Sequence, residues 1–442
     1  MKEIYWNEST AKNAPNIYNL IAKIEDKRKG KKRNSDNVII ILTYKSKEQT
    51  KEFIYTLTKQ NFKDYDIILI YGPGDEIIDL PKNLNVVHIF RKEDIGCAGG
   101  FYLGEKYAYE AEYEKFIHIE SDVRFVNNDT LKKIIETSNE YDIVMPTVFT
   151  PDLFIKGRGM HQATCFNRKV IEKVGFTLYP LYFGAEDGEY ESRIKTVGSA
   201  ILIKDYVTHP TKSPILVGPY KAYYFTRNDL FVDSLIGTKV LIQASYRIWE
   251  IIFLFLNKNK GYKTKLLGIK DFLKLKLGRI TELKDEGECL IMEDEKIKDR
   301  IKKDNNIVFS CRMNHDDLKP IVPPLLKNIP RINIKSKGDL GIKKILTFFS
   351  EYFSNINKVY NKTVITNHAN YFDYSFYSLV SKELILYENS KWYNRKFKFK
   401  DRIAALLSYS LIPLVILVSL IIVLYSKIFI YPKKKYTYSY GW

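Results

Sequence analysis

Two groups of carboxylates are the residues of this chain best able to do chemistry. Glu120 and Asp122 enclose Ser121 directly after Lys115–Ile119, an apolar run that predicts a buried strand. Two carboxylates at this spacing can face a hard divalent cation that also holds a diphosphate. Such a triplet is common by chance, so its place after a strand carries more weight than its composition.

The second group lies in the segment 183–189, where Glu186, Asp187 and Glu189 follow one another closely. Carboxylates this dense repel one another unless some of them meet a cation, a helix N-terminus or a reacting hydroxyl. One carboxylate in such a group can act as a general base. A helix N-terminus enriched in acidic residues would account for Asp187 and Glu189 without catalysis. Arg193 stands four residues after Glu189, the spacing of neighbours on one helix face.

A glycine-rich segment and a histidine add to these groups. The segment 94–101 reads DIGCAGGF and precedes a helical pattern. A turn of this kind lets backbone N–H groups approach an anion, although a simple tight turn has the same composition. His209 ends a strand that begins near Ala200. We interpret His209 as a metal ligand, although a lone histidine is more often structural.

Apart from the group at 186–189, these residues follow predicted strands, and this places them together. Strands alternating with helices predict a mainly parallel sheet with right-handed crossovers, and its ligands bind beyond the carboxyl ends of the strands. Thr43 and Tyr44 follow the first strand and Asp75 follows the second, at the same edge. The apolar runs that predict the strands are 37–43, 65–71, 85–90 and 115–119.

Composition excludes several classes of protein. The chain has 442 residues, 45% of them hydrophobic, and 70 Lys and Arg against 52 Asp and Glu, a formal charge of +18. The length exceeds that of one ordinary domain, and the hydrophobic content excludes general disorder. Its 4 cysteines have no CxxC spacing, so no disulfide framework or zinc site is indicated. No nucleic-acid motif accompanies the basic runs, such as 27–33, so we expect no nucleic acid and take lipid and nucleotide phosphates as counter-charges.

One segment is typical of a membrane helix. Ile403–Ser426 carries no charge, and about 20 apolar residues span a bilayer core. The alternative is a very hydrophobic core helix. Basic residues flank the segment on both sides, so they favour a cytoplasmic N-terminal flank only slightly. Trp249–Leu256 and the basic stretch Lys258–Arg279 fit either an interfacial segment or a solvated helix packed on the main domain.

In their order along the chain, these motifs resemble those of the family 2 glycosyltransferases. The resemblance is to the bacterial and archaeal branch that includes rhamnosyl- and galactofuranosyltransferases of surface polysaccharide synthesis, and it covers about residues 36–230. It rests on NVIIILTY (37–44), the second strand with its glycine turn, DIGCAGGFYLG (94–104), IESDV (119–123), FGAEDGEYESRI (183–194), His209 and YYFTRN (223–228).

The resemblance implies the GT-A fold of nucleotide-diphospho-sugar transferases, an α/β fold with a mainly parallel sheet flanked by helices. A mostly helical C-terminal region and a C-terminal transmembrane helix would follow it. The expected regions are 1–35, a helical and basic extension; 36–240, the catalytic domain; 241–400, a helical, basic and partly interfacial region; and 403–431, the membrane helix with a short basic tail.

The resemblance also implies roles for single residues. Asp187 would be the catalytic base and His209 the third metal ligand. The other implied sites are metal ligands (Asp122, Glu120), donor contacts (Thr43, Tyr44, Asp75, Asp94, Gly96, Gly99, Gly100) and the acceptor side (Glu186, Tyr224, Arg227, Asn228).

Three positions depart from the family pattern. Glu120 replaces an Asp and so lengthens that arm of the acidic motif, and Asp94 stands where an Asn is usual. Tyr71 replaces the acid that usually precedes the glycine turn. These departures bear on the identity of the donor more than on the class of reaction.

The implied activity is inverting, metal-dependent sugar transfer with Mn²⁺ or Mg²⁺. The donor would be a UDP- or dTDP-linked sugar and the acceptor a lipid-linked glycan, at a cell membrane with the catalytic domain in the cytoplasm. Oligomerisation is left open. The alternatives are a nucleotidyltransferase of sugar activation and a non-catalytic membrane scaffold that retains the fold. The nucleotidyltransferase is disfavoured because Thr43–Lys47 has no glycine after the first strand.

Overall fold

A computed structural model describes the larger part of the chain, and every structural statement below concerns those residues. They are 18–26, 33–81, 83–150, 155–157, 160–194, 197–209, 216–236, 240–280, 283, 290, 292–297, 307–311, 331–333, 359–360, 362–366, 371–388 and 391–430. Most of the basic run 27–33 and the basic tail after 430 lie outside the described residues.

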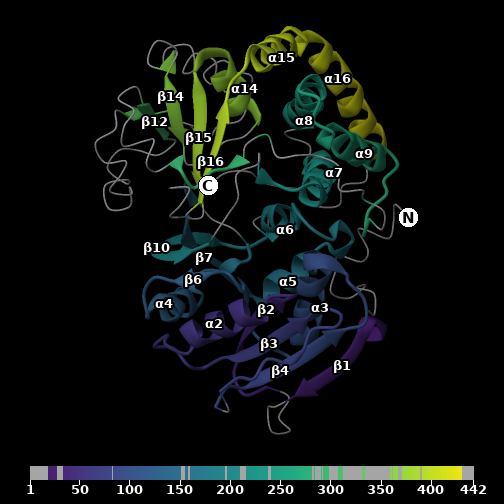
Figure 1. The fold of residues 1–442 in the computed structure, drawn as a ribbon. Helices are drawn as coiled ribbons and strands as arrows, with labels where there is room; N and C mark the ends of the chain where they lie inside the picture. Colours follow the sequence, from purple (N-terminus) through teal and green to yellow (C-terminus); the bar gives the residue numbers. More distant parts are fainter. Residues whose placement is uncertain are drawn as a thin grey trace.

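The first sheet carries the expected parallel core. Its central strands β4, β3, β2 and β5 pair in parallel, and β7 pairs in parallel with β10 (Figure 1). Antiparallel strands β1, β9, β6 and β8 complete it. In sheet order the strands are β1 (Ile21–Asp26), β4 (Val86–Arg91), β3 (Asp66–Tyr71), β2 (Asn37–Thr43), β5 (Lys115–Glu120), β9 (Gln162–Asn167), β7 (Ile143–Thr150), β10 (Ala200–Thr208) and β6 (Arg124–Phe125), with β8 (Ile155–Gly157) beside β7.

Helices cover both faces of this sheet, which explains why its central strands are apolar throughout. Alternate residues of β2, such as Ile40 and Ile39, face opposite sides. Ile40 packs in the cluster that contains residues of α3, α5 and α6, while Ile39 packs with α2 and α4. These helices are α2 (Lys47–Leu57), α3 (Gly96–Glu110), α4 (Thr130–Thr137), α5 (Arg168–Val174) and α6 (Glu186–Ile194).

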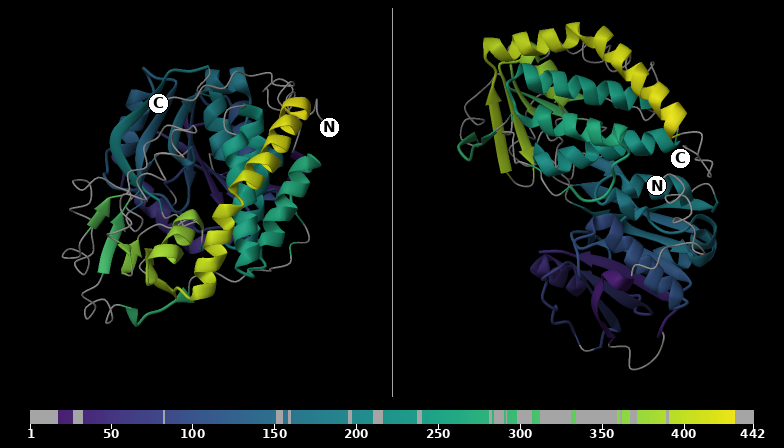
Figure 2. Two further views of the ribbon diagram at one scale, coloured as in Figure 1. Left: turned by 90° about the horizontal axis from the view of Figure 1, so that it is seen from above. Right: turned by 90° about the vertical axis from the view of Figure 1, so that its right-hand side faces the viewer.

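A layer of helices lies above the carboxyl edge of the first sheet, and a second sheet stands beside it (Figures 1 and 2). The helices are α7 (Pro219–Ile236), α8 (Val240–Leu256), α9 (Gly261–Leu273), α15 (Phe399–Ser410) and α16 (Ile412–Phe429). The second sheet contains β11 (Met292–Glu293), β16 (Lys391–Lys396), β15 (Glu383–Glu388), β14 (Thr363–Thr366), β12 (Ile307–Cys311) and β13 (Arg331–Asn333), and α14 (Tyr371–Val380) packs against it.

The structure differs from the sequence prediction at both ends of the chain. The helical pattern in residues 1–35 is wrong for 21–26, because this segment forms β1 and pairs with β4. The region 241–400 has the expected helices α8 and α9, but it also contains the second sheet, which the sequence analysis does not predict. The described strands of that sheet are only two to six residues long, so no long apolar run marks them.

The uncharged segment Ile403–Ser426 is divided between two helices. α15 ends at Ser410, and α16 begins at Ile412 with Pro413 in its first turn. Proline lacks an N–H and clashes with the carbonyl four residues earlier, so it starts a helix better than it continues one. Among the described residues, α16 is the one helix long and apolar enough to cross a membrane.

Candidate active site

The first carboxylate group meets His209 at the carboxyl edge of the first sheet. Glu120 ends β5, Asp122 lies in the turn that follows, and His209 follows β10. The His209 Nε2 atom is 2.8 Å from Glu120 Oε2 and 3.2 Å from Asp122 Oδ1. The structure therefore brings together the three residues that the sequence analysis assigns to a metal ion.

Charge compensation holds these three side chains in place. Burial alone would lower the pKa of His209, but hydrogen bonds to Asp122 and Glu120 and their negative charges raise it to about 10. The imidazole is therefore protonated near neutral pH when the two carboxylates are its partners. Two carboxylates and an imidazole suit Mn²⁺, and their oxygens suit Mg²⁺. A metal needs the neutral imidazole, so its binding must displace a proton from His209.

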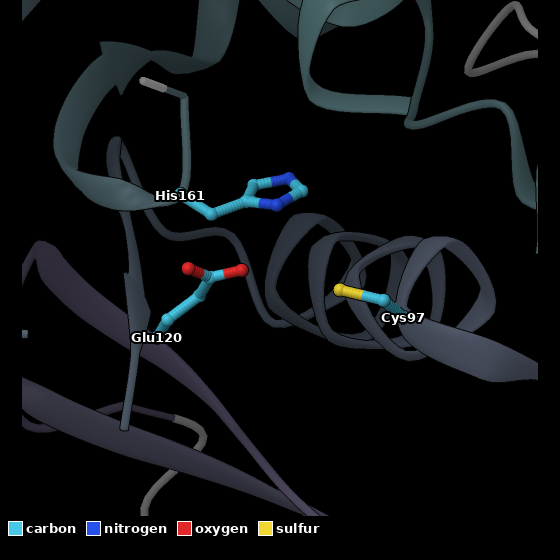
Figure 3. A group of neighbouring side chains, drawn as sticks. All are labelled: Cys97, Glu120 and His161. Atoms are coloured by element: carbon cyan, nitrogen blue, oxygen red, sulfur yellow. The ribbon is translucent and has the colours of Figure 1, made fainter. Parts of the chain in front are cut away.

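Glu120 also belongs to a second group, with Cys97 and His161 (Figure 3). The ligand atoms of these three side chains lie within 4.8 Å of one another. Burial, with the nearby His118, lowers the pKa of His161 to about 3, and burial raises the pKa of the Cys97 thiol well above its usual value. Sequence reasoning missed both residues. Cys97 lies within the glycine-rich segment 94–101, which is interpreted through its backbone alone. No motif in the sequence marks His161 as a possible ligand.

The second carboxylate group opens α6. Gly184 and Ala185 have φ values of 79° and 66°, a left-handed turn that directs the chain into the helix. Burial raises the pKa of Glu186 to about 8, with the charge of Asp187 adding to the effect, and Glu186 shares a hydrogen bond with Cys97. Glu186 therefore holds a proton near neutral pH.

Asp187 has a different protonation state. Gly188 N–H donates to its Oδ1 over 2.8 Å, and this bond lowers the pKa of the carboxyl group. Burial and the charges of Glu120, Glu191 and Asp229 act in the opposite direction and bring it to about 6. Asp187 is therefore ionised near neutral pH, yet basic enough to accept a proton.

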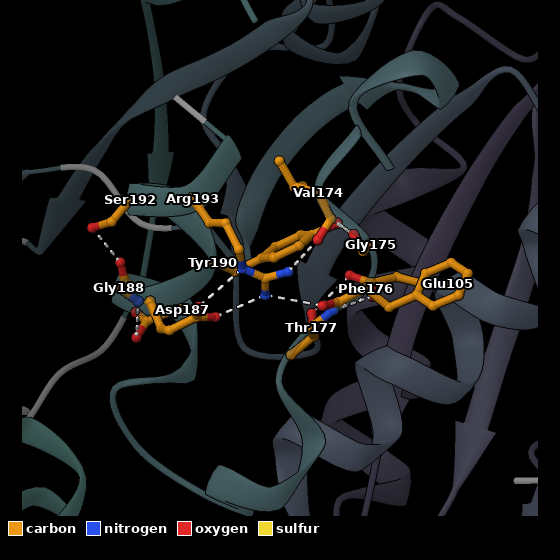
Figure 4. Close-up of polar contacts among 11 residues, drawn as sticks. Glu105, Val174, Gly175, Phe176, Thr177, Asp187, Gly188, Tyr190, Ser192 and Arg193 are labelled. Atoms are coloured by element: carbon orange, nitrogen blue, oxygen red, sulfur yellow. Dashed lines mark hydrogen bonds and ion pairs between the residues drawn. The ribbon is translucent and has the colours of Figure 1, made fainter. Parts of the chain in front are cut away.

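A buried ion pair fixes the helix that carries Asp187 (Figure 4). Arg193 Nε and Nη2 donate to the two oxygens of Glu189 over 2.9 and 2.8 Å. The guanidinium also donates to the carbonyls of Val174 and Phe176. The expected pair of Glu189 and Arg193 is present. This ion pair accounts for Glu189, one of the three acidic residues of the group, without a catalytic role.

The proposed donor residues mostly shape the loops that follow the strands. Thr43 is buried and accepts a hydrogen bond from Thr50. Asp75 accepts from the N–H groups of Gly72 and Lys45 and so ties together the loops after β3 and β2. Tyr44 is the exposed member of this set, with 41% of its surface accessible, and its ring covers Gly72.

The glycine segment serves packing more than anion binding. Asp94 accepts from Gly96 N–H, and Ala98 N–H donates to the Tyr182 carbonyl, so these two donors are already engaged. Gly96 has a φ of 72°, and a Cβ there would lie 2.0 Å from the Tyr182 oxygen. At the next two glycines, Gly99 and Gly100, a Cβ would meet Ile95 and Leu42 at 2.7 and 2.8 Å.

The residues predicted to flank the acceptor side, Tyr224, Arg227 and Asn228, are all buried. Asn228 Nδ2 donates to the carbonyls of Leu181, Phe183 and Gly184, and Arg227 donates to Leu181 and Gly278. The Tyr224 hydroxyl accepts from Ile280 N–H. These residues position the loop before Asp187, so they support the site from inside the protein.

Comparison with known proteins gives similarity at the level of the fold. No family model matches the chain, and no curated protein matches it in sequence. A mannosyltransferase from Pyrobaculum calidifontis, solved with GDP-Man and Mn²⁺, is 14% identical with a TM-score of 0.34; the match covers 44% of this chain and 62% of that one. TarS of S. aureus, solved with UDP-GlcNAc, is 16% identical with a TM-score of 0.36, over 54% and 81%.

A 4-diphosphocytidyl-2C-methyl-D-erythritol synthase from Anaerococcus prevotii is similar over 39% of this chain and 90% of its own, with 14% identity and a TM-score of 0.29. All three TM-scores are low, so these similarities assign no function to this chain.

Replacing Arg193 by Met should destabilise the protein strongly, because the buried carboxylate of Glu189 would lose its guanidinium partner. Breaking a buried ion pair typically costs about 3–5 kcal/mol. Urea unfolding followed by circular dichroism measures the loss. The exposed pair of Lys132 with Glu136 on α4 is the control, and Lys132→Met should cost about 0.5 kcal/mol or less. Equal losses in the two variants would contradict the structural role of Arg193.

Asp122→Ala and His209→Ala should each weaken the binding of Mn²⁺, measured by calorimetry. Ligands of one ion act as a unit, so the double variant should bind little worse than either single variant. Strictly additive losses would mean that His209 does not share the ion. Glu140→Ala, which removes an exposed carboxylate beyond α4, should bind Mn²⁺ like the parent chain.

Glu186→Gln should stabilise the protein increasingly as the pH rises from about 4.5 to about 8. Over this range the unfolded chain releases the Glu186 proton while the folded chain retains it, so the parent loses up to about 1.4 kcal/mol per pH unit. The neutral amide escapes this loss. Thermal unfolding at several pH values in a chelator measures the difference. A difference that does not vary with pH would show that Glu186 is ionised in the folded protein.

Proposed function

We propose that the chain is an inverting, metal-dependent glycosyltransferase of the family 2 type that uses a nucleotide-sugar donor. The observation that carries the proposal is the pairing of Asp187, a partly buried carboxylate with a pKa of about 6, with the metal-type group of Glu120, Asp122 and His209. Glu120 links the two, because its charge adds to the effect of burial in raising the pKa of Asp187.

The roles of the residues follow from their protonation states. Asp187 Oδ1 is occupied by the Gly188 N–H, so the other oxygen, Oδ2, is the atom that would accept the proton of an acceptor hydroxyl. That oxygen of the acceptor forms a bond to the anomeric carbon as the bond from this carbon to the diphosphate breaks. One displacement of this kind inverts the anomeric centre. The protonated Glu186 can donate a hydrogen bond to a hydroxyl of a bound sugar.

The metal ion would be held by Asp122, Glu120 and His209. When bound, Mn²⁺ or Mg²⁺ supplies positive charge to the leaving nucleoside diphosphate. Without a metal ion, the protonated His209 supplies the positive charge between Glu120 and Asp122. All these residues lie within 36–240, the range that we propose as the catalytic unit.

The acceptor class rests on the C-terminal helices. We take the acceptor to be a lipid-linked glycan of a surface polysaccharide and the donor to be a UDP- or dTDP-linked sugar, as in the rhamnosyl- and galactofuranosyltransferase branch. A chain held at the membrane raises the effective concentration of such an acceptor. A cytoplasmic position of the catalytic unit is part of this proposal.

Asp187→Asn should reduce sugar transfer by about 10²–10⁴-fold and leave donor binding largely intact, because the amide keeps the shape but cannot accept a proton. Release of nucleoside diphosphate from a panel of UDP- and dTDP-sugars, with Mn²⁺ and a lipid-linked acceptor, measures transfer. Glu172→Gln, which changes a carboxylate on α5, is the control and should transfer normally.

Three outcomes would contradict this proposal. Near-parental transfer by Asp187→Asn would exclude Asp187 as the base. Release of pyrophosphate from a nucleoside triphosphate and a sugar phosphate would indicate a nucleotidyltransferase. Donor binding without turnover of any sugar in the panel would favour a non-catalytic scaffold.

A further inference from the structure

One face of α16 packs on the helical layer. Its buried residues Val415, Ser419, Ile422 and Ser426 form a single stripe along the helix. Ser426 Oγ lies 2.8 Å from Ser234 Oγ of α7, and the side chain of Ile422 packs in a cluster with residues of α7 and α8. α16 and α8 lie side by side (Figure 2). This face of α16 is therefore covered by the helices α7 and α8.

The opposite face of α16 is apolar and exposed. Leu417, Ile421, Leu424 and Ile428 are 55–64% accessible. They follow the buried stripe with an offset of two residues, which is roughly 200° around an α-helix. Leu406 of α15 is exposed to a similar degree, so the apolar surface continues beyond the break at Leu411. An apolar surface of this extent marks a contact with a membrane or a partner.

The exposed charges of α9, α15, α16 and their flanking residues are of one sign. In the described residues 257–280 and 391–430, the two acidic residues, Asp271 and Asp401, are buried. The exposed charged residues of these ranges are all basic. They include Lys263, Lys270, Lys274, Lys398, Lys400 and Lys427. An apolar surface with a basic border matches the interface of a membrane that contains anionic lipid.

The neighbours of α16 argue against its crossing the bilayer in this arrangement. α8 lies alongside it and carries Arg247 and Glu250, which form buried ion pairs with Asp229 and Lys265. If α16 crossed with its packing intact, these charges would lie at the depth of the hydrocarbon, where charges are costly. A helix lying in the interface keeps them on the protein side.

We propose that α15 and α16 bind the surface of an anionic membrane in the plane of the bilayer, with their leucines among the acyl chains and the lysines at the headgroups. The bound ligand is the lipid surface itself. The test of this attachment does not depend on the proposed sugar transfer, since none of the residues that make it belongs to the candidate active site.

The positions of the two ends of the helix pair test the in-plane arrangement. Lys400→Cys and Lys427→Cys are made separately, and labelling by a membrane-impermeant maleimide is measured in sealed vesicles of known orientation, above the labelling of the parent chain. In-plane binding places both cysteines on the same side. Labelling of the two from opposite sides would overturn the proposal in favour of a spanning helix.

Vesicle binding tests the surface. The full chain should sediment with vesicles of phosphatidylcholine and phosphatidylglycerol, and less with phosphatidylcholine alone. Leu417→Glu combined with Ile421→Glu should weaken this binding more than about tenfold, since each leucine-sized side chain gains roughly 1.5–3 kcal/mol on burial. Val126→Glu, which places a single Glu at an exposed apolar residue directly after β6, is the control.

Equal binding by the double variant and the parent chain would overturn the proposal. Equal loss in the double variant and Val126→Glu would do the same, because the effect would then be one of charge alone. Circular dichroism and a thermal melt establish that the variants are folded. Formation of a lipid-independent dimer that masks Leu417 and Ile421 from vesicles would assign the surface to a second copy instead.

Discussion

Repulsion between carboxylates is the constraint on which the candidate site depends. Glu120, Asp122, Glu186 and Asp187 lie close enough to influence one another in a partly buried place, where like charges interact strongly. Two features reduce this repulsion: the positive charge on His209 and the proton on Glu186. Asp187 stays ionised near neutral pH, with its pKa raised by burial to about 6, and this combination is what a general base requires.

The rigidity of the surrounding backbone comes from residues that never reach the site. Asn228 and Arg227 hold the carbonyls of the loop that leads into α6, and the Arg193–Glu189 pair holds the helix itself. Gly96 lets the start of α3 approach the same loop at Tyr182. These buried polar contacts and the close approach at Gly96 therefore hold the loop and the helix that carry Asp187.

The sequence predicts the parts of this structure that depend on local patterns. Continuous apolar runs mark β2 to β5. Because parallel strands end at one edge of a sheet, the sequence alone predicts that Glu120, Asp122 and His209 lie close together. Burial could not be predicted in the same way. Arg227 and Asn228 are polar and belong to a motif that resembles the acceptor side of the family. Only the packing of α7 shows that their side chains are buried.

Other differences arise from long-range pairing. β1 forms because its backbone completes the edge of β4, and the second sheet assembles from short segments far apart in the chain. His161 reaches Glu120 only because β9 lies beside β5. The division of the uncharged segment is the exception. Pro413 is visible in the sequence, but proline is tolerated in membrane helices and so did not predict the break.

The contact between Ser234 and Ser426 joins residues that are 192 positions apart. During translation, α7 and α8 therefore emerge well before the helix that covers them, and the second sheet is made in between. Their apolar sides, at Leu235 and Ala244, stay open to chaperones or to a bilayer until α16 has been synthesised. The packing of α16 is thus a late step in folding, because the helical layer can be completed only after the ribosome has synthesised this helix.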